Sequence, residues 1–182
     1  MPKTAVDLLL ASNSPRRKEL LSQMGVNFSV IANSVDESLQ TAETPRDYVS
    51  RLALAKARGG FALSWSNTPV LGADTAVVLG QQIFGKPSDA DEARSMLTAL
   101  SARKHSVVTA VAVTDGVTSA SRVSVSEVTF RCIEACECRD YVRTGEPMDK
   151  AGGYAIQGFG GVFIEHLEGS YSGVGWSAVR NG

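Results

Sequence analysis

Short apolar runs and helical apolar spacings alternate along the N-terminal part of the chain. The run VDLLL predicts a strand over residues 6–10. Ser14 then suits the N-cap of a helix, because Pro15 fits the first helical position and an apolar stripe follows up to Gly25. The run VNFSVIA, residues 26–32, predicts a second strand. The pattern here is therefore strand, helix, strand.

The middle of the chain continues this alternation. Thr44 and the proline after it open a helix whose apolar face has Lys56 at its edge. Residues 69–79 form an apolar strand that the polar Asp74 interrupts, and GQQIFGKP then predicts a short hairpin. Ser88, with a carboxylate three residues later, predicts the start of a further helix. Strands and helices thus alternate as in an α/β fold.

The C-terminal half has a different pattern. Segments 105–113 and 117–131 flank the turn TDG and predict an antiparallel pair with one face in water. A short helix at 140–142 ends near Gly145, and a glycine-rich loop with a final strand follows. Together the patterns predict an α/β fold in which helices pack on an extended mixed sheet.

Composition and charge narrow the class of protein. The chain has 182 residues, of which 43% are hydrophobic, so one globular unit is expected. A net charge of -1 gives no overall electrostatic case for binding nucleic acid or a membrane surface. No apolar run approaches the roughly 20 residues that span a bilayer, and the N-terminus does not resemble a secretory signal. A cytoplasmic location is therefore the default expectation.

The three cysteines crowd into one short segment, Cys132, Cys136 and Cys138. An odd number at this spacing does not suit a disulfide framework, so reduced thiols are expected. The C-x3-C-x-C spacing also fits no common zinc pattern. We therefore assign the cysteines no metal-binding role.

A cluster of hydroxyls and cations marks the first strand-to-helix turn: Ser12, Ser14, Arg16 and Arg17. Cations near a helix N-terminus are unfavourable by roughly 0.3–1 kcal/mol each unless an anion offsets them. Backbone N–H groups, hydroxyls and guanidinium groups at such a turn can converge on a phosphate. The turn lacks the glycine spacing of a Walker A loop or of a dinucleotide fingerprint. An exposed basic helix start explains the local pattern equally well.

Two carboxylates occupy positions where burial makes them costly. Asp74 lies within an apolar strand, and Glu37 follows another. Such a pair can hold a magnesium or manganese ion, which prefers oxygen ligands. An ion pair with Lys56 or Lys86 is the structural alternative. Both explanations require cations beside the carboxylates.

A glutamine stands within the glycine-rich C-terminal loop. Gln157 is preceded by two glycines and followed by three within a few residues, so the backbone there can approach a ligand closely. The planar amide of Gln157 suits the edge of a nucleobase. An ordinary loop glutamine explains the same residue if the segment is considered alone.

Eight blocks together resemble the Maf family of nucleoside triphosphate pyrophosphatases. In order they are ASNSPRR, VDES, LALAKAR, GADTAVV, GKPSDADEA, EVTFR, EPMDKAGGYAIQG and GGVFIEHLEGSYSGV. The match as a whole runs from about Leu8 to Val174. The resemblance implies a fold similar to inosine triphosphate pyrophosphatases (Maf/Ham1-like): an elongated mixed sheet flanked by helices, with two lobes around a central cleft. Residues 1–182 would then form a single domain, and a homodimer is one expected assembly.

The resemblance also implies an activity. Family members hydrolyse a nucleoside triphosphate to the monophosphate and pyrophosphate with a divalent cation, here magnesium, manganese or cobalt. The IQG and GSY motifs are similar to the branch that acts on dTTP and UTP, with modified pyrimidine nucleotides as further candidates. By position, Asp74 matches the proton acceptor. The other matching positions are Arg16, Thr75 and Gln157 for substrate choice, and Glu37, Lys56 and Lys86 for the metal and phosphate site.

Two other functions remain open. One is a catalytically weak nucleotide-binding protein that regulates cell division through the same cleft. The other is a phosphomonoester hydrolase, which would release orthophosphate in place of pyrophosphate. Measured turnover distinguishes the first from the family activity, and the identity of the released product distinguishes the second.

The C-terminal end departs from the family pattern. After GSYSGV the family continues with a second valine, a GLP motif and a last helix, whereas this sequence reads GWSAVRNG over residues 175–182. Suitable codons for the last seven residues, read one base later, encode Gly-Leu-Pro-Phe-Val-Thr. We therefore hypothesise a frameshift in this segment. The candidate site residues all precede it.

Overall fold

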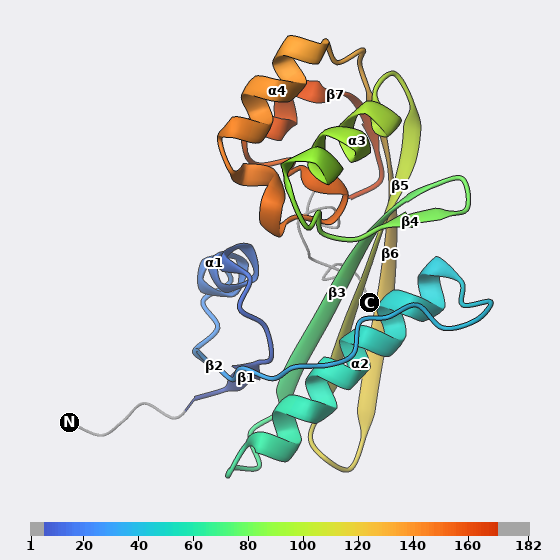
Figure 1. The fold of residues 1–182 in the computed structure, drawn as a ribbon. Coiled ribbons are helices and arrows are strands. Elements are labelled where there is room, and N and C mark those ends of the chain that lie inside the picture. The colour runs from blue at the N-terminus through green and yellow to red at the C-terminus, as the bar shows by residue number, and fades with distance from the viewer. Residues whose placement is uncertain (1–5, 171–182) are drawn as a thin grey trace. The chain divides into compact units, whose positions relative to one another are not determined.

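A computed structural model describes residues 6–170 (Figure 1). The ending at residues 175–182 lies outside this range. No helix among the described residues is long and apolar enough to cross a membrane. The elements are β1 (Leu8–Leu10), α1 (Pro15–Gln23), β2 (Phe28–Val30), α2 (Pro45–Leu63), β3 (Val70–Leu79), β4 (Gln82–Phe84), α3 (Ala90–Leu100), β5 (Lys104–Thr114), β6 (Ser119–Phe130), α4 (Ala135–Arg143), the 3-10 helices η1 (Glu146–Asp149), η2 (Ala151–Gly153) and η3 (Phe159–Phe163), and β7 (Ile164–Glu168).

The strands form one mixed sheet in the order β2-β1-β3-β5-β6-β7, and β4 pairs with β3. β1 runs parallel to β2 and to β3, whereas the pairs β3–β4 and β6–β7 are antiparallel. Parallel neighbours need crossover connections, which α1 and α2 supply. Of the antiparallel pairs, β3 and β4 are joined by a tight turn, whereas α4 and three 3-10 helices lie between β6 and β7. The predicted α/β fold with a mixed sheet is confirmed.

The described residues divide into two compact units. The first contains residues 6–74 and 109–123, and the second contains residues 75–108 and 124–170. The strands β3, β5 and β6 each contribute residues to both units. The two lobes around a central cleft stay a prediction, and each unit is described separately below.

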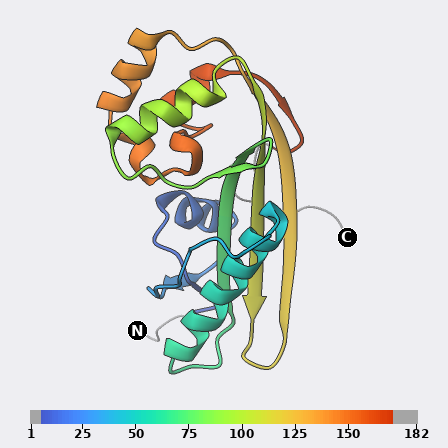
Figure 2. The same ribbon diagram turned by 45° about the vertical axis from the view of Figure 1, so that its right-hand side comes forward.

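In the first unit, α2 lies directly against β3 because Gly72 has no side chain. A Cβ at this position would lie 2.3 Å from the carbonyl oxygen of Ala53 and 2.5 Å from the amide nitrogen of Ala57. Those two residues flank Lys56 on α2, so the close approach brings that lysine to Asp74 on β3. Figure 1 shows α2 running along β3. The turn between β5 and β6 also belongs to this unit and lies near the end of α2 (Figure 2). A Cβ added at Gly116 in this turn would meet the ring of Phe61 on α2.

In the second unit, α3 and α4 pack side by side over a large apolar core (Figure 2). An aromatic cluster lies within it: the ring centroid of Phe130 is 4.8 Å from that of His105 and 4.7 Å from that of Tyr154. The Nε2 atom of His105 and the hydroxyl of Tyr154 share a hydrogen bond of 2.8 Å. A neutral histidine is therefore built into the core.

This buried histidine predicts a pH-dependent stability. Burial lowers the pKa of His105 from 6.5 to about 4. Between these two pH values the unfolded chain therefore binds a proton at His105 that the folded chain does not bind. The free energy of unfolding is at its full value above about pH 6.5 and falls as the pH drops from there towards 4. Between pH 7 and pH 5 we expect this residue to cost about 2 kcal/mol of unfolding free energy.

Urea unfolding at pH 7 and pH 5 measures this effect, and His105→Gln should flatten the pH dependence by about 2 kcal/mol. The control is His166→Gln, which makes the same replacement at an exposed position on β7. Identical pH dependence in His105→Gln and the unmodified protein would contradict the account.

Two predicted helix starts were wrong. α3 has Asp89 as its N-cap, whose side chain accepts the amide of Glu92, and not Ser88. Ser88 instead donates its amide and hydroxyl to the carboxylate of Glu92, at 2.7 and 2.6 Å. α4 begins at Ala135, well before the predicted 140–142, because Glu134 forms a capping box with the third helical residue.

Candidate active site

Two carboxylates and one lysine meet in the first unit. The Nζ atom of Lys56, on α2, lies 2.6 Å from Oδ1 of Asp74 on β3 and 2.6 Å from Oε1 of Glu37 in the loop before α2. The side chains of Lys56 and Asp74 are 15% and 11% exposed, whereas that of Glu37 is half-exposed. The sequence singled out all three residues, and of the two lysines considered as partners the structure pairs the carboxylates with Lys56.

Burial has the largest influence on the pKa of Asp74. It raises the pKa of Asp74 above the ordinary carboxyl value, although the charges of Lys56 and Arg17 lower it. The first effect is the larger one, since a carboxylate loses its hydration inside the protein. Asp74 is therefore a better proton acceptor than a solvated aspartate.

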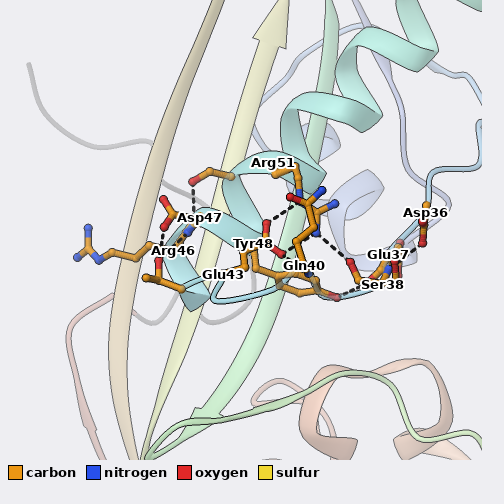
Figure 3. Close-up of polar contacts among 11 residues, drawn as sticks. Asp36, Glu37, Ser38, Gln40, Glu43, Arg46, Asp47, Tyr48 and Arg51 are labelled. Carbon is orange, nitrogen blue, oxygen red and sulfur yellow. Dashed lines mark hydrogen bonds and ion pairs between the residues drawn. The ribbon is translucent and has the colours of Figure 1, made fainter.

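The loop that bears Glu37 is held in place by α2 (Figure 3). The hydroxyl of Tyr48 donates to the backbone carbonyl of Glu37 at 2.9 Å. Arg51 donates to both carboxylate oxygens of Glu43 at 2.6 and 2.8 Å, and to the carbonyl of Ser38 at 3.0 Å. A bidentate guanidinium pair of this kind fixes orientation as well as distance. The position of Glu37 therefore depends on Tyr48 and Arg51.

The sequence did not single out Tyr48 and Arg51 as site residues. Both lie on the helix that carries Lys56, within YVSRLALAK. The available signal was the arginine in this mostly apolar stretch. Asn33 also escaped notice: its side-chain amide donates to the backbone carbonyl of Lys56 at 2.9 Å.

The predicted phosphate turn is also in the first unit. The hydroxyl of Ser12 accepts the amide of Ser14 at 3.2 Å and a guanidinium N–H of Arg17 at 3.0 Å. Ser14 occupies the N-cap of α1, and its side chain makes no capping bond. Arg16 is 3.2 Å from Glu19, and its Nε atom is buried with no hydrogen-bond partner among the described residues. This turn therefore has donors available for an anion.

Arg17 is coupled to the carboxylates by charge. Removal from water lowers the pKa of its guanidinium, and the charges of Asp74 and Glu37 oppose that shift. The group stays protonated at any physiological pH. The phosphate turn and the carboxylate pair thus belong to one electrostatic site.

The two carboxylates fit a divalent metal whose remaining ligands are waters and oxygens of a bound phosphate compound. Among residues 6–170 no group of three His, Cys, Asp or Glu could hold a metal ion. Glu37 and Asp74 nevertheless converge on one cation, Lys56. Magnesium in nucleotide enzymes is commonly held by one or two carboxylates, with waters and phosphate oxygens as the other ligands. Two carboxylates are therefore sufficient for that kind of site.

Three predicted site residues belong to the second unit. Thr75 follows Asp74 on β3 and is partly buried. Lys86 is exposed in the loop after β4, beside a cavity of about 380 Å³ that Gly85 also lines. Gln157 is exposed in the turn before η3. Their roles in substrate binding stay predictions.

Comparison with known proteins identifies the relatives of this chain. A dTTP/UTP pyrophosphatase of Pseudoalteromonas atlantica is 49% identical over 170 residues, covering 92% of this chain and 88% of that protein. One of Alcanivorax borkumensis is 54% identical over 168 residues, covering 92% and 87%.

Among solved structures, the Staphylococcus aureus Ham1 protein matches with a TM-score of 0.49 and 16% identity, over 86% of this chain and 79% of that one. The family model described as Maf-like protein matches residues 7–175. The chain therefore belongs to the Maf family.

Proposed function

We propose that this protein is a dTTP/UTP pyrophosphatase, which hydrolyses these nucleotides to the monophosphate and pyrophosphate. The observation that carries the proposal is the convergence of Glu37 and Asp74 on Lys56, each 2.6 Å away. Phosphoryl transfer requires charge neutralisation and an oriented water more than a protein nucleophile. The names of relatives at about half identity support the choice of substrate.

The phosphate turn would bind the triphosphate. Ser12, Ser14 and the N-terminus of α1 supply hydroxyl and amide donors, and the unpartnered Nε of Arg16 supplies a further donor. Arg17 adds a fixed positive charge beside the carboxylates. Lys86, from the second unit, is proposed to offset further phosphate charge. A bound anion at such a turn attracts both the helix N-terminus and the cations, so it offsets the repulsion between them.

Asp74 would direct the hydrolytic water. Its raised pKa suits a group that accepts the proton of a water attacking the α-phosphorus. The bond between the α-phosphorus and the bridging oxygen then breaks, and pyrophosphate leaves with the electron pair. Lys56 keeps the carboxylate of Asp74 in place through its 2.6 Å contact.

A divalent cation, magnesium, manganese or cobalt, would be held by Glu37 and Asp74. When bound, such an ion offsets phosphate charge and makes water more acidic. The choice among the three metals stays open. The chain's own residues supply two carboxylate ligands for it.

Base selection would belong to Thr75 and Gln157. The exposed amide of Gln157 presents one donor and one acceptor side, which suits the edge of thymine or uracil. Modified pyrimidine nucleotides that keep this edge are further candidate substrates. A homodimer and a cytoplasmic location stay predictions.

A panel of nucleoside triphosphates with magnesium, manganese or cobalt tests the proposal. We expect kcat/KM for dTTP and UTP at least about tenfold above that for dCTP, dATP and dGTP. Pyrophosphate should be the product, so orthophosphate should appear only after inorganic pyrophosphatase is added. Orthophosphate without that enzyme would favour phosphomonoester hydrolysis. Binding without turnover would favour the regulatory alternative.

A further inference from the structure

One carboxylate in the second unit accepts three hydrogen bonds. Glu146, at the start of η1, accepts the amide of Phe159 at 2.8 Å and the amide of Gly160 at 3.0 Å. The hydroxyl of Tyr141, on α4, donates to the same carboxylate at 2.9 Å. Glu146 therefore joins α4 to the first two residues of η3, where the loop between η2 and η3 ends.

The α4 side of this connection is packed into the core of the second unit. The ring of Tyr141 is 5% exposed and packs edge-on against Phe163 with centroids 5.1 Å apart. Burial, and after it the hydrogen bond to Glu146, raises the pKa of Tyr141, so its phenol keeps the proton that it donates. The loop is thus tied to the core through Glu146.

The loop is built around this carboxylate. A Cβ on Gly158 would lie 2.4 Å from each carboxylate oxygen of Glu146, so only glycine leaves the carboxylate in its place. Gly158 closes a turn by donating its amide to the carbonyl of Ala155 at 3.2 Å. Gln157 lies inside that turn, immediately before the residues that Glu146 holds. Its backbone orientation is therefore set by Glu146.

We propose that Glu146 is a positioning residue for base selection: its carboxylate fixes the turn that presents Gln157 and thereby sets the preference for thymine and uracil over cytosine. This rests on the proposed function, in which Gln157 contacts the base. Cytosine differs from thymine and uracil along its pairing edge, where an amino donor replaces the C4 carbonyl acceptor and N3 accepts a hydrogen bond instead of donating one. If the side-chain amide of Gln157 is misplaced, the enzyme should lose its discrimination between these bases before it loses its turnover rate.

Glu146→Gln tests the proposal with little change in shape. The substitution replaces one carboxylate oxygen with an NH2 group, which must face an N–H donor of Phe159 or Gly160. We expect the ratio of kcat/KM for dTTP over dCTP to fall about tenfold, with KM for dTTP rising and kcat within about threefold of the unmodified protein. Hydrogen exchange at the amides of Phe159 and Gly160 should accelerate.

A second variant leaves Glu146 intact. Gly158→Ala should displace the carboxylate and reproduce the loss of selectivity. Glu165→Gln is the matched control, since Glu165 is exposed on β7 and its replacement should change neither selectivity nor exchange. Thermal unfolding of each variant separates selectivity from loss of fold.

The outcomes separate the two proposals. If the unmodified protein prefers dTTP and Glu146→Gln keeps that preference, the role of Glu146 is overturned and the proposed function stands. If the unmodified protein hydrolyses neither dTTP nor UTP, the proposed function fails without any variant being needed. The role of Glu146 in base selection then fails as well, because it rests on that function. Loss of selectivity in both Glu146→Gln and Gly158→Ala supports the inference.

Discussion

Asp74→Asn is expected to lower kcat for dTTP by about a thousandfold or more, while binding of the triphosphate survives. Asparagine keeps the size of the side chain and an oxygen that can accept from Lys56, but it removes the charge and the proton acceptor. General-base catalysis alone accounts for roughly 10²–10⁴ in rate, and loss of a metal ligand adds to that. Rapid-quench turnover, together with calorimetric dTTP binding, measures the two effects separately.

The loss should come from chemistry and not from unfolding. Because burial disfavours the charged form of Asp74, a neutral side chain is tolerated in its place. Asp140→Asn is the matched control: Asp140 is exposed on α4, and its ion pairs with Arg139 and Arg143 are 3.8 Å long. It should keep full turnover. Asp74→Asn with kcat near that of the unmodified protein would remove Asp74 from the mechanism.

Lys56→Met is expected to have the largest effect on stability. Methionine has a similar length but no charge, so Asp74 would keep a buried carboxylate without its cation at 2.6 Å. Breaking a buried pair in this way costs about 3 kcal/mol of unfolding free energy, reduced somewhat here by the half-exposed Glu37. Turnover should fall as well, since the carboxylates lose their fixed positions. Urea unfolding and dTTP hydrolysis measure both.

The double variant Lys56→Met/Asp74→Asn isolates the interaction. Removing both charges should restore about 2 kcal/mol of the stability that Lys56→Met loses, because no buried charge is left unpaired. Lys104→Met is the control: Lys104 is half-exposed, and its nearest carboxylate, on Glu168, is 3.3 Å away and exposed, so the cost should stay below about 1 kcal/mol. Strictly additive losses in the double variant would show that the pair does not stabilise the fold.

Local signals were enough to predict most of the fold. α2 begins where Thr44 predicted, since the side chain of Thr44 accepts the amide of Asp47 and a proline follows. Capping and apolar spacing act within a single element, so they can be recognised in sequence. The N-cap of α3 was misplaced by one residue because Ser88 and Asp89 are both good caps, and only the contact with Glu92 decides between them.

The site was predicted residue by residue but not as a geometry. Asp74 and Lys56 stood out because each is a charge in an apolar pattern. Their contact depends on Gly72, whose missing side chain lets α2 approach β3, and that effect involves segments distant in sequence. Glu146 gave no local signal, since its three donors come from α4 and from the glycine-rich loop. Long-range hydrogen bonds of this kind become visible only in three dimensions.

The position of water attack tests the account most directly. Hydrolysis of dTTP by the unmodified protein in water enriched in oxygen-18, followed by mass spectrometry of both products, reports which phosphorus the water attacked. We expect one heavy oxygen in the thymidine monophosphate and none in the pyrophosphate. Label in the pyrophosphate, or in released orthophosphate, would contradict attack at the α-phosphorus.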